Sequence, residues 1–269
     1  MAEIDRKAVV VGISGCSSSG KTTLARLLRD IFPNTFILHE DDFYKNDKDI
    51  PISVDGLADW DCAGALSLPD MEQALAHIRT HGVLPPDLFS KEDQNSVGKC
   101  PVSDETIEAM KAKVHAWLQP GQPGHKLVAA SDSDSTSGDA GTIRICIFDG
   151  FLLYSEETRA TMEQIDVRLF LRVSHAKATQ RREARDGYVT LEGFWQDPPG
   201  YVDKIVWPNY VEAHKWLFDD GDVEGTPNRT TLEENRILTQ LDKGIDIDMT
   251  TTLEWAVDTL MRELGGKYL

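Results

Sequence analysis

The feature that most constrains this chain is a glycine-rich segment at residues 15–22, directly after a short apolar run. Its sequence, Gly-Cys-Ser-Ser-Ser-Gly-Lys-Thr, has the spacing of a phosphate-binding loop. The glycines allow a turn whose backbone N–H groups point at phosphate oxygens, Lys21 reaches the β- and γ-phosphates, and the Thr22 hydroxyl can ligate Mg²⁺. A helix expected from residue 22 adds its positive N-terminal end. The sequence therefore predicts a nucleoside triphosphate site made by Gly15, Cys16, Ser17, Ser18, Ser19, Gly20, Lys21, Thr22 and Thr23.

Composition sets the size of the fold and narrows the class of partner. The 269 residues, 41% of them hydrophobic, are enough for one large domain, so we expect a single domain over residues 1–269. The 45 acidic and 28 basic residues give a net charge of −17, which disfavours nucleic acid and anionic membranes as partners. The four cysteines lack C-x-x-C spacing, and we see neither a signal peptide nor a membrane span. These features favour the cytoplasm, with nuclear entry left open.

Apolar runs and helical stretches alternate along the chain. Strands are expected at residues 8–13, 35–39, 143–148 and 167–173, with a weaker candidate at 222–223, and helices at 22–31 and 176–185. This alternation predicts an α/β fold in which a mostly parallel sheet has helices on both faces. Ligands of such a sheet bind at the carboxyl ends of its strands, where the phosphate-binding loop also lies.

Residues 84–141 interrupt this alternation and are interpreted as an insertion. Residues 104–118 have a helical pattern, whereas residues 119–141 are rich in Pro, Gly, Ser and Asp. The latter stretch has too little apolar surface to order itself, so we expect a disordered acidic loop, with regulatory phosphorylation as an alternative. Near the end of the chain, residues 251–264 carry apolar side chains at helical spacing, which predicts a closing amphipathic helix.

Carboxylates follow two of the expected strands. Glu40, Asp41 and Asp42 come directly after the second strand, which places them at the rim of the sheet beside the phosphates. An acceptor hydroxyl needs a group there that accepts its proton, and carboxylates also hold Mg²⁺. The alternative is that these acids merely end the strand. Asp149 follows the strand expected at 143–148, and the pattern leaves open whether it contacts a Mg²⁺-bound water or supports the loop.

Trp60 and Asp61 form an aromatic–carboxylate pair in a turn-rich stretch. An aromatic ring can stack on a base, and a carboxylate can accept hydrogen bonds from two ribose hydroxyls. This pattern alone favours a core tryptophan followed by a helix-capping Asp61.

Three arginines gather on one expected helix. Arg181 and Arg185 are four residues apart and so share a face, with Arg182 beside them. Arginines in this arrangement suit the charge of a transferring phosphoryl group, the alternative being a solvated charged face. The following residues 186–189 and 197–201 contain glycine and tyrosine and are suited to a lid.

Several of these segments, in order, resemble one known family. Residues 12–25, 40–45, 149–154, 199–203 and 206–210 are similar to motifs of nicotinamide riboside kinases, which belong with the uridine kinase-like P-loop kinases. The likeness runs through most of the chain except residues 84–141. It implies a P-loop kinase fold with a five-stranded sheet of order 2-3-1-4-5 and an arginine-bearing lid. It also implies phosphorylation of the 5′-hydroxyl of nicotinamide riboside by ATP and Mg²⁺, giving nicotinamide mononucleotide for NAD⁺ synthesis. GTP is an alternative phosphoryl donor and nicotinic acid riboside an alternative acceptor.

The same resemblance implies roles for individual residues. Asp41 would accept the proton and, with Thr22, belong to the magnesium shell. The riboside site would be lined by Asp41, Asp42, Phe43, Tyr44, Trp60, Asp61, Arg182, Tyr188 and Val189. The phosphoryl group would be met by Lys21, Arg181 and Arg185, and the loop with Pro227, Asn228 and Arg229 would lie beside adenine.

The chain departs from the family pattern at three points. Trp60 stands where the family has tyrosine, Asp149 stands where it has glutamate, and the spacing from Arg185 to Tyr188 is one residue longer. A uridine, cytidine or other small-metabolite kinase on the same scaffold is one alternative, and a nucleotide-dependent switch or scaffold is another. A GTP switch would ordinarily carry Asn-Lys-x-Asp, which the sequence lacks. The acceptor-side carboxylate and the lid arginines favour an enzyme.

Overall fold

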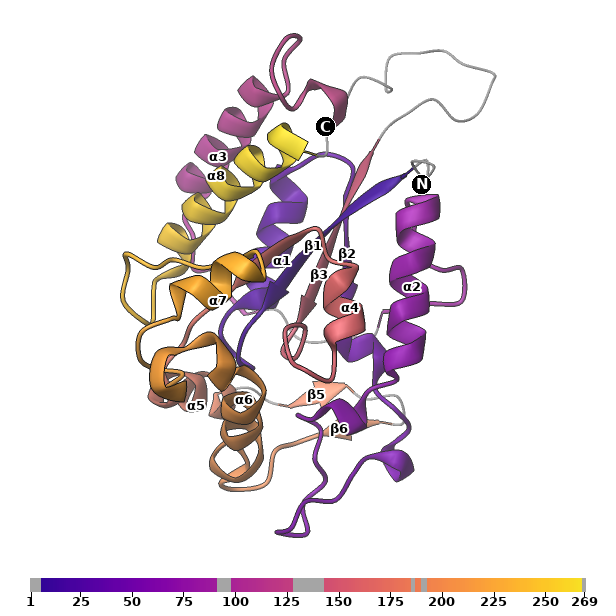
Figure 1. Ribbon diagram of the computed structural model, residues 1–269, viewed down its shortest axis with the longest axis vertical. Helices are drawn as coiled ribbons and strands as arrows, with labels where there is room; N and C mark the ends of the chain where they lie inside the picture. Colours follow the sequence, from indigo (N-terminus) through magenta and orange to yellow (C-terminus); the bar gives the residue numbers. More distant parts are fainter. Residues whose placement is uncertain (1–5, 91–97, 128–142, 185–186, 190–192, 268–269) are drawn as a thin grey trace.

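The computed structural model describes residues 6–90, 98–127, 143–184, 187–189 and 193–267. At its centre is a sheet whose strands run in the order β2-β3-β1-β4-β7, with every neighbouring pair parallel (Figure 1). The strands are β1 (Ala8–Ser14), β2 (Thr35–His39), β3 (Arg144–Gly150), β4 (Val167–Phe170) and β7 (Ile237–Leu238). Counted along the chain within this sheet, the order is 2-3-1-4-5, so the expected topology is confirmed.

The edge strand is not where the sequence suggested. Residues 222–223 form a turn, in which Asp222 accepts hydrogen bonds from the backbone N–H groups of Glu224 (3.0 Å) and Gly225 (2.9 Å). An aspartate that binds the backbone just after it favours a turn over a strand. The prediction of a strand at 222–223 was therefore wrong, and the edge strand is β7, which pairs with β4.

Helices cover both faces of the sheet, as expected (Figure 1). One face is covered by α1 (Lys21–Ile31), α3 (Asp104–Trp117) and α8 (Met249–Lys267), and the other by α2 (Leu68–His81) and α4 (Arg159–Glu163). All seven residues of β1 are buried because their side chains alternate between the two apolar cores. Val9 and Val11 pack on the α1 side, and Ala8 and Val10 pack on the opposite side.

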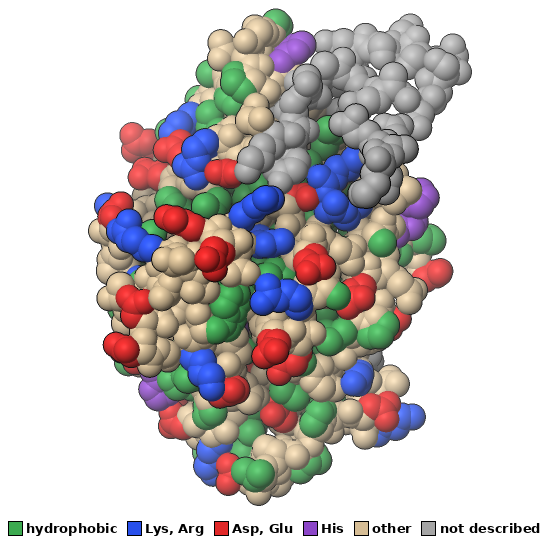
Figure 2. All heavy atoms as spheres, in the orientation of Figure 1, with side chains coloured by type: hydrophobic (Ala, Val, Ile, Leu, Met, Phe, Trp, Pro, Cys, Tyr) green, Lys and Arg blue, Asp and Glu red, His purple; other side chains and the backbone are tan. Residues whose placement is uncertain are grey.

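The segments at the carboxyl ends of the strands form the lower part of the molecule in Figure 1. They comprise α5 (His175–Glu183), an antiparallel hairpin of β5 (Tyr188–Val189) and β6 (Phe194–Trp195), a π-helical turn (Val202–Val206) and α6 (Trp207–His214). The short helix α7 (Arg229–Glu234) lies beside the edge strand β7. Short 3₁₀ helices lie at Glu40–Phe43, Asp47–Asp49, Ala63–Ala65, His125–Leu127, Lys215–Leu217 and Asp219–Gly221. Of the helices described, none is both long and apolar enough to cross a membrane. Acidic and basic side chains are interspersed over the face shown in Figure 2.

Part of the expected insertion belongs to the core. The helix expected at 104–118 is α3, and its Val114 and Trp117 are buried in the cluster that also holds α1 and α8. Residues 119–127, which we expected to be disordered, form turns and a 3₁₀ helix that ends at the fully buried Leu127. Burial of a single apolar side chain such as Leu127 can hold a short polar segment against the core. The composition of the segment does not reveal such a contact. The remainder, residues 128–141, lies outside the described residues.

Candidate active site

The phosphate-binding loop joins β1 to α1 and has the backbone that the sequence predicts. Gly15 and Gly20 have φ angles of 146° and 104°, and a side chain at Gly15 would collide with the carbonyl oxygen of Leu171, 2.3 Å from the expected Cβ position. The buried Lys21 donates a hydrogen bond from Nζ to the carbonyl oxygen of Cys16 (2.9 Å). Burial lowers the pKa of its ammonium, and attraction to Asp149 opposes this.

Polar atoms of this loop are poised for an anion. The hydroxyls of Ser18 and Ser19 are buried and lack a hydrogen-bond partner within the described residues. Arg181 reaches over the loop and donates from NH1 to the carbonyl oxygens of Ser18 (3.3 Å) and Ser19 (3.4 Å). Buried donors without partners are costly in the absence of a ligand, so the loop fits a phosphate chain. Arg181, which the sequence predicts as a lid arginine, thus lies against this loop in the structure.

Asp149 lies at the carboxyl end of β3, beside Lys21 and Thr22. Its Oδ1 contacts Nδ1 of His39 (2.6 Å), which ends the neighbouring strand β2, while Oδ2 is buried without a hydrogen-bond partner in the described parts of the chain. Burial raises the pKa of Asp149, but His39, the Thr22 hydroxyl and Lys21 together hold that pKa below its usual value. Asp149 therefore combines structural support with one available carboxylate oxygen.

This corner also fits Mg²⁺. Among the described residues no group of three or more His, Cys, Asp or Glu could hold a metal ion by itself. Magnesium at a nucleotide is usually bound by one or two protein oxygens together with phosphates and water. Thr22, Asp149 and Asp41, whose charge also acts on Lys21, supply oxygens of that kind.

The segment that carries Asp41 is anchored by its neighbour. Glu40 is fully buried, and its Oε2 accepts hydrogen bonds from the backbone N–H groups of Phe151 (2.6 Å) and Leu152 (3.0 Å) after β3. Burial raises the pKa of Glu40 to about 8. Phe43 of the same 3₁₀ helix is buried in the apolar core, so this predicted riboside residue has a packing role in the structure. Asp41 and Asp42 stay partly exposed at the rim.

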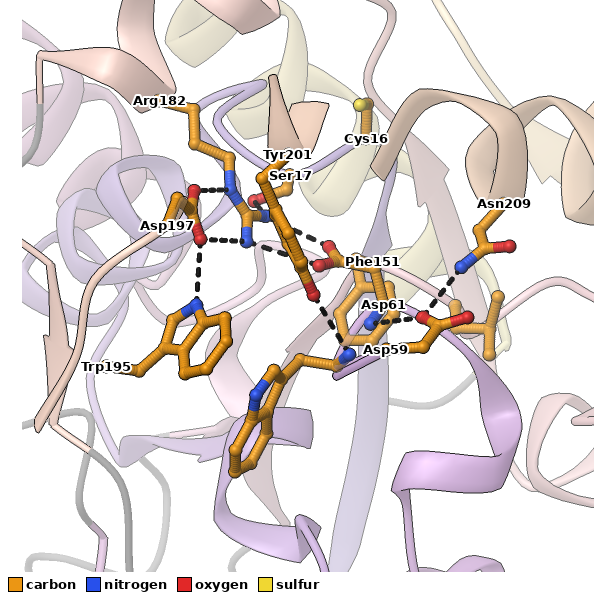
Figure 3. Close-up of polar contacts among 12 residues, drawn as sticks. Cys16, Ser17, Asp59, Asp61, Phe151, Arg182, Trp195, Asp197, Tyr201 and Asn209 are labelled. Carbon is orange, nitrogen blue, oxygen red and sulfur yellow. Dashed lines mark hydrogen bonds and ion pairs between the residues drawn. The ribbon is translucent and has the colours of Figure 1, made fainter. Parts of the chain in front are cut away.

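Asp61 and Arg182 meet beside the loop (Figure 3). Arg182 donates to Oδ1 (2.9 Å) and Oδ2 (3.2 Å) of Asp61, and its NH1 also donates to the Ser17 hydroxyl (2.8 Å). The opposite edge of the guanidinium binds Asp197, with 2.6 Å between Nε and Oδ2. Burial raises the pKa of Asp61, and the ion pair with Arg182 opposes this. Asp61 is thus not the helix cap that its local pattern favoured, and Arg182 is not on a solvated face.

Trp60 lies in a cluster of aromatic rings. It is buried and packs edge-on against Tyr44 (ring centroids 5.2 Å apart) and at 50° to Trp195 (5.7 Å). Its indole Nε1 is buried with no hydrogen-bond partner among the residues that the structure describes. Its backbone N–H donates to the hydroxyl of Tyr201 (3.0 Å), which in turn donates to the carbonyl oxygen of Ala58 (3.0 Å).

Three residues of this region were missed by sequence reasoning, namely Asp59, Trp195 and Asn209, whereas Asp197 and Tyr201 lie in the segment 197–201 that was expected to form a lid but received no individual role. Asn209 of α6 donates to Asp59 (2.8 Å) and, with Tyr201, fixes the loop that presents Trp60 and Asp61. Tyr201 and Asn209 belong to the motifs at 199–203 and 206–210, so the signal was present but carried no assigned role. Trp195 and Asp197 have no recognisable spacing to the other site residues.

The remaining predicted residues are placed as follows. Arg185 lies outside the described residues; Tyr188 and Val189 form β5, with Tyr188 opposite Trp195 in the hairpin.

The loop predicted beside adenine precedes and begins α7. Asn228 uses its side chain to cap α7, accepting from the Thr231 N–H (2.9 Å) and donating to Asp219 (2.9 Å). Pro227 pairs with Phe218, and Arg229 is exposed.

Comparison with known proteins places these features in a family. A scan of family models gave no match. Nicotinamide riboside kinase from Schizosaccharomyces pombe is 37% identical over 260 residues, covering 96% of this chain and 99% of that protein. The proteins of the same name from Eremothecium gossypii and Saccharomyces cerevisiae are 32% and 31% identical, covering 95% and 82% of this chain and 93% and 83% of their own lengths.

Among solved structures, a putative fructose transport system kinase from Silicibacter sp. TM1040 matches with a TM-score of 0.39 and 16% identity, over 65% of this chain and 70% of that one. That likeness is too weak to add to the fold described above. The sequence relatives are decisive because the first of them is 37% identical over an aligned region that covers 96% of this chain. The chain belongs to the nicotinamide riboside kinase family.

Proposed function

We propose that this protein transfers the γ-phosphoryl group of ATP to the 5′-hydroxyl of nicotinamide riboside, giving nicotinamide mononucleotide and ADP. The observation that carries the proposal is the position of Arg182, which binds Ser17 of the phosphate-binding loop and Asp61 of the acceptor side at once. A nucleotide switch has no need for a carboxylate coupled to its phosphate loop in this way. The relatives named above support the same reaction.

Each side of the reaction has its own residues in the proposal. Lys21 and Arg181 offset phosphate charge, and Thr22 and Asp149, with Asp41, supply oxygens for Mg²⁺, which when bound neutralises charge that develops on the transferring group. Asp41 orients the 5′-hydroxyl and accepts its proton. Arg185 is proposed to bring a second positive charge to the phosphoryl group.

Asp61 is proposed to bind the ribose. Each of its oxygens already accepts one hydrogen bond from Arg182, and each has a further lone pair for a 2′- or 3′-hydroxyl. Trp60 is proposed to stack on the nicotinamide ring, a fixed pyridinium cation, with a favourable energy of roughly 0.5–2 kcal/mol.

All four cysteines are free thiols, which supports the proposal of a cytoplasmic location.

ADP release across a panel of acceptors tests this function. Wild type should use nicotinamide riboside with a higher kcat/KM than uridine, and Trp60→Ala should lose much of that preference. Nicotinic acid riboside and GTP, tested in the same assay, define the acceptor and donor range. Equal or better use of uridine by wild type would favour a uridine kinase, and ADP release that no acceptor stimulates would favour a switch.

A further inference from the structure

We propose that His39 is a positioning residue for Mg²⁺: it holds one oxygen of Asp149 so that the other oxygen is presented to the hydrated ion of a bound nucleotide. The inference rests on the proposed function in its use of Mg²⁺ with ATP, and it gives a role to a side chain to which sequence reasoning assigned none. His39 ends β2, and Asp149 lies near the end of the neighbouring strand β3 (Figure 1).

The register of the sheet places the two side chains next to each other. His39 is paired with Asp149 in the parallel β2–β3 ladder, so both side chains leave the same face of the sheet. Ile37, two positions earlier in β2, packs on the face that α1 covers. Because side chains alternate along a strand, His39 and Asp149 point to that face as well. It is the face on which α1 begins with Lys21, so the strands direct both groups toward the phosphate-binding loop.

A hydrogen bond holds Asp149 from one side. Its Oδ1 lies 2.6 Å from Nδ1 of His39, and the two side chains are 5% and 3% exposed. Burial raises the pKa of Asp149, but His39 and the hydroxyl of Thr22 hold that pKa below its usual value, so the carboxylate is ionised at neutral pH. An ionised carboxylate only accepts hydrogen bonds. Nδ1 of His39 therefore carries the hydrogen and donates it.

The second oxygen of Asp149 is the one that a ligand can use. Oδ2 is buried and has no hydrogen-bond partner among the residues that the structure describes. A buried carboxylate oxygen without a partner is costly, and a cation or a donor supplied by a ligand removes that cost. The charge of Lys21 acts on Asp149, and the Thr22 hydroxyl interacts with the same carboxylate. Oδ2 thus belongs to the corner at which Mg²⁺ would be held.

The donor from His39 restricts rotation of the whole carboxylate of Asp149. Groups that bind a ligating carboxylate orient it, and their loss typically weakens metal binding by roughly 10- to 100-fold. The same contact also ties the end of β2 to β3. A loss of stability alone would therefore not separate a positioning role from a structural one, and metal binding is the informative quantity.

Calorimetry with a non-hydrolysable ATP analogue measures this quantity without any phosphoryl acceptor. We define the Mg²⁺ ratio as the Kd of the analogue in EDTA divided by its Kd in Mg²⁺. His39→Leu removes the donor and should lower the Mg²⁺ ratio by roughly 10-fold. His39→Asn places an amide N–H where Nδ1 lies and should retain most of the ratio. The Kd in EDTA should stay near the wild-type value in both variants, because the phosphate-binding loop is unchanged.

Two controls separate positioning from packing. Ile37→Val, on the same strand and the same face, loses packing but no side-chain hydrogen bond and should leave the Mg²⁺ ratio unchanged. In an Asp149→Ala background, His39→Leu should cause no further fall, because His39 acts through that carboxylate. A further fall of the same size in that background would overturn the proposal, and so would an unchanged Mg²⁺ ratio in folded His39→Leu.

If His39→Leu does not fold, the comparison of His39→Asn with His39→Gln decides. The amide of glutamine lies where Nε2 of the imidazole would be and does not replace Nδ1. A larger fall of the Mg²⁺ ratio in His39→Gln supports the proposal, and equal ratios in the two variants overturn it.

These measurements also separate the inference from the function on which it rests. A wild type that does not phosphorylate nicotinamide riboside contradicts the proposed function, whereas the Mg²⁺ ratio still tests His39. A wild type that binds the analogue equally well with and without Mg²⁺ overturns the role of His39, whatever acceptor the protein uses.

Discussion

Arg182 and Asp61 form a buried bidentate ion pair, with N–O distances of 2.9 and 3.2 Å. The pair joins α5 to the loop that follows the 3₁₀ helix at Asp47–Asp49, two segments that are distant in the sequence. Asp197 shares the guanidinium, so one cation holds two carboxylates and the hydroxyl of Ser17. Removal of any one partner therefore affects both the stability of the fold and the acceptor side.

Asp61→Ala is expected to show this double effect. It leaves Arg182 buried with one carboxylate fewer, which should lower the free energy of unfolding by about 3 kcal/mol. It should also weaken nicotinamide riboside and uridine alike, with a smaller penalty for 2′-deoxyribosides, because the ribose contact is common to both. Denaturant unfolding and steady-state kinetics measure the two effects. A variant that loses activity on only one of the two substrates, nicotinamide riboside or uridine, would contradict the assignment of Asp61 to the ribose.

Asp41→Asn should lower kcat by roughly 10²-fold or more, because the amide keeps the shape of the side chain and loses its basicity and charge. The matched variant is Asp42→Asn, one residue along the same 3₁₀ helix, which should retain far more activity. Rates at saturating substrate compare the two. If kcat falls in Asp42→Asn and not in Asp41→Asn, then Asp42, and not Asp41, is the proton acceptor.

His214 makes stability sensitive to acid. It is fully buried on α6, and burial lowers its pKa from 6.5 to about 4, although its contact with the carbonyl oxygen of Tyr210 (3.0 Å) opposes this. The unfolded chain then binds the proton more readily, so this contribution is present above pH 6.5 and is lost as the pH falls toward 4. It amounts to about 3 kcal/mol. Unfolding of wild type and His214→Gln between pH 4 and 7 tests this: the variant should have the flatter profile, and parallel profiles would exclude His214.

The two parts of the insertion should respond differently to deletion. Replacement of residues 128–141 by a short Gly-Ser linker should change the free energy of unfolding by no more than about 1 kcal/mol, because loop closure entropy varies slowly with length. A deletion that begins at Gly121 also removes the buried Leu127 and should cost about 2–5 kcal/mol. Thermal unfolding of both proteins measures the two losses. A large loss on replacement of 128–141 alone, or a small loss in the longer deletion, would contradict this division.

The sequence predicts the sheet and the backbone of the phosphate-binding loop well because their signals are local. Gly15, Gly20 and Lys21 have fixed spacing, and β1 is apolar up to its last residue, Ser14, because both faces of the strand are covered. The edge strand β7 was not predicted, since only two of its residues pair and the tendency of Asp222 to form a turn was not recognised. The local pattern misread Asp61 as a helix cap, whereas the family resemblance predicts it on the acceptor side.

Other parts of the site depend on contacts that no spacing encodes. Trp195 meets Trp60 only because the β5–β6 hairpin lies beside the loop that Tyr201 anchors. Glu40 adjoins the predicted Asp41 but points into the core, where it binds the backbone after β3. Leu127 orders a segment whose composition indicates disorder. In each case tertiary packing overrides a local preference.

Direct detection of nicotinamide mononucleotide is the plainest test of the reaction proposed for this site. Purified wild type, Mg²⁺, ATP and nicotinamide riboside should yield nicotinamide mononucleotide and ADP in equal amounts. Lys21→Ala, which removes the ammonium at the phosphates and leaves the core unchanged, should melt near the wild-type temperature and yield no product. Absence of nicotinamide mononucleotide with wild type would contradict the proposed reaction, and its near-normal formation by folded Lys21→Ala would contradict the phosphate site assigned to Lys21.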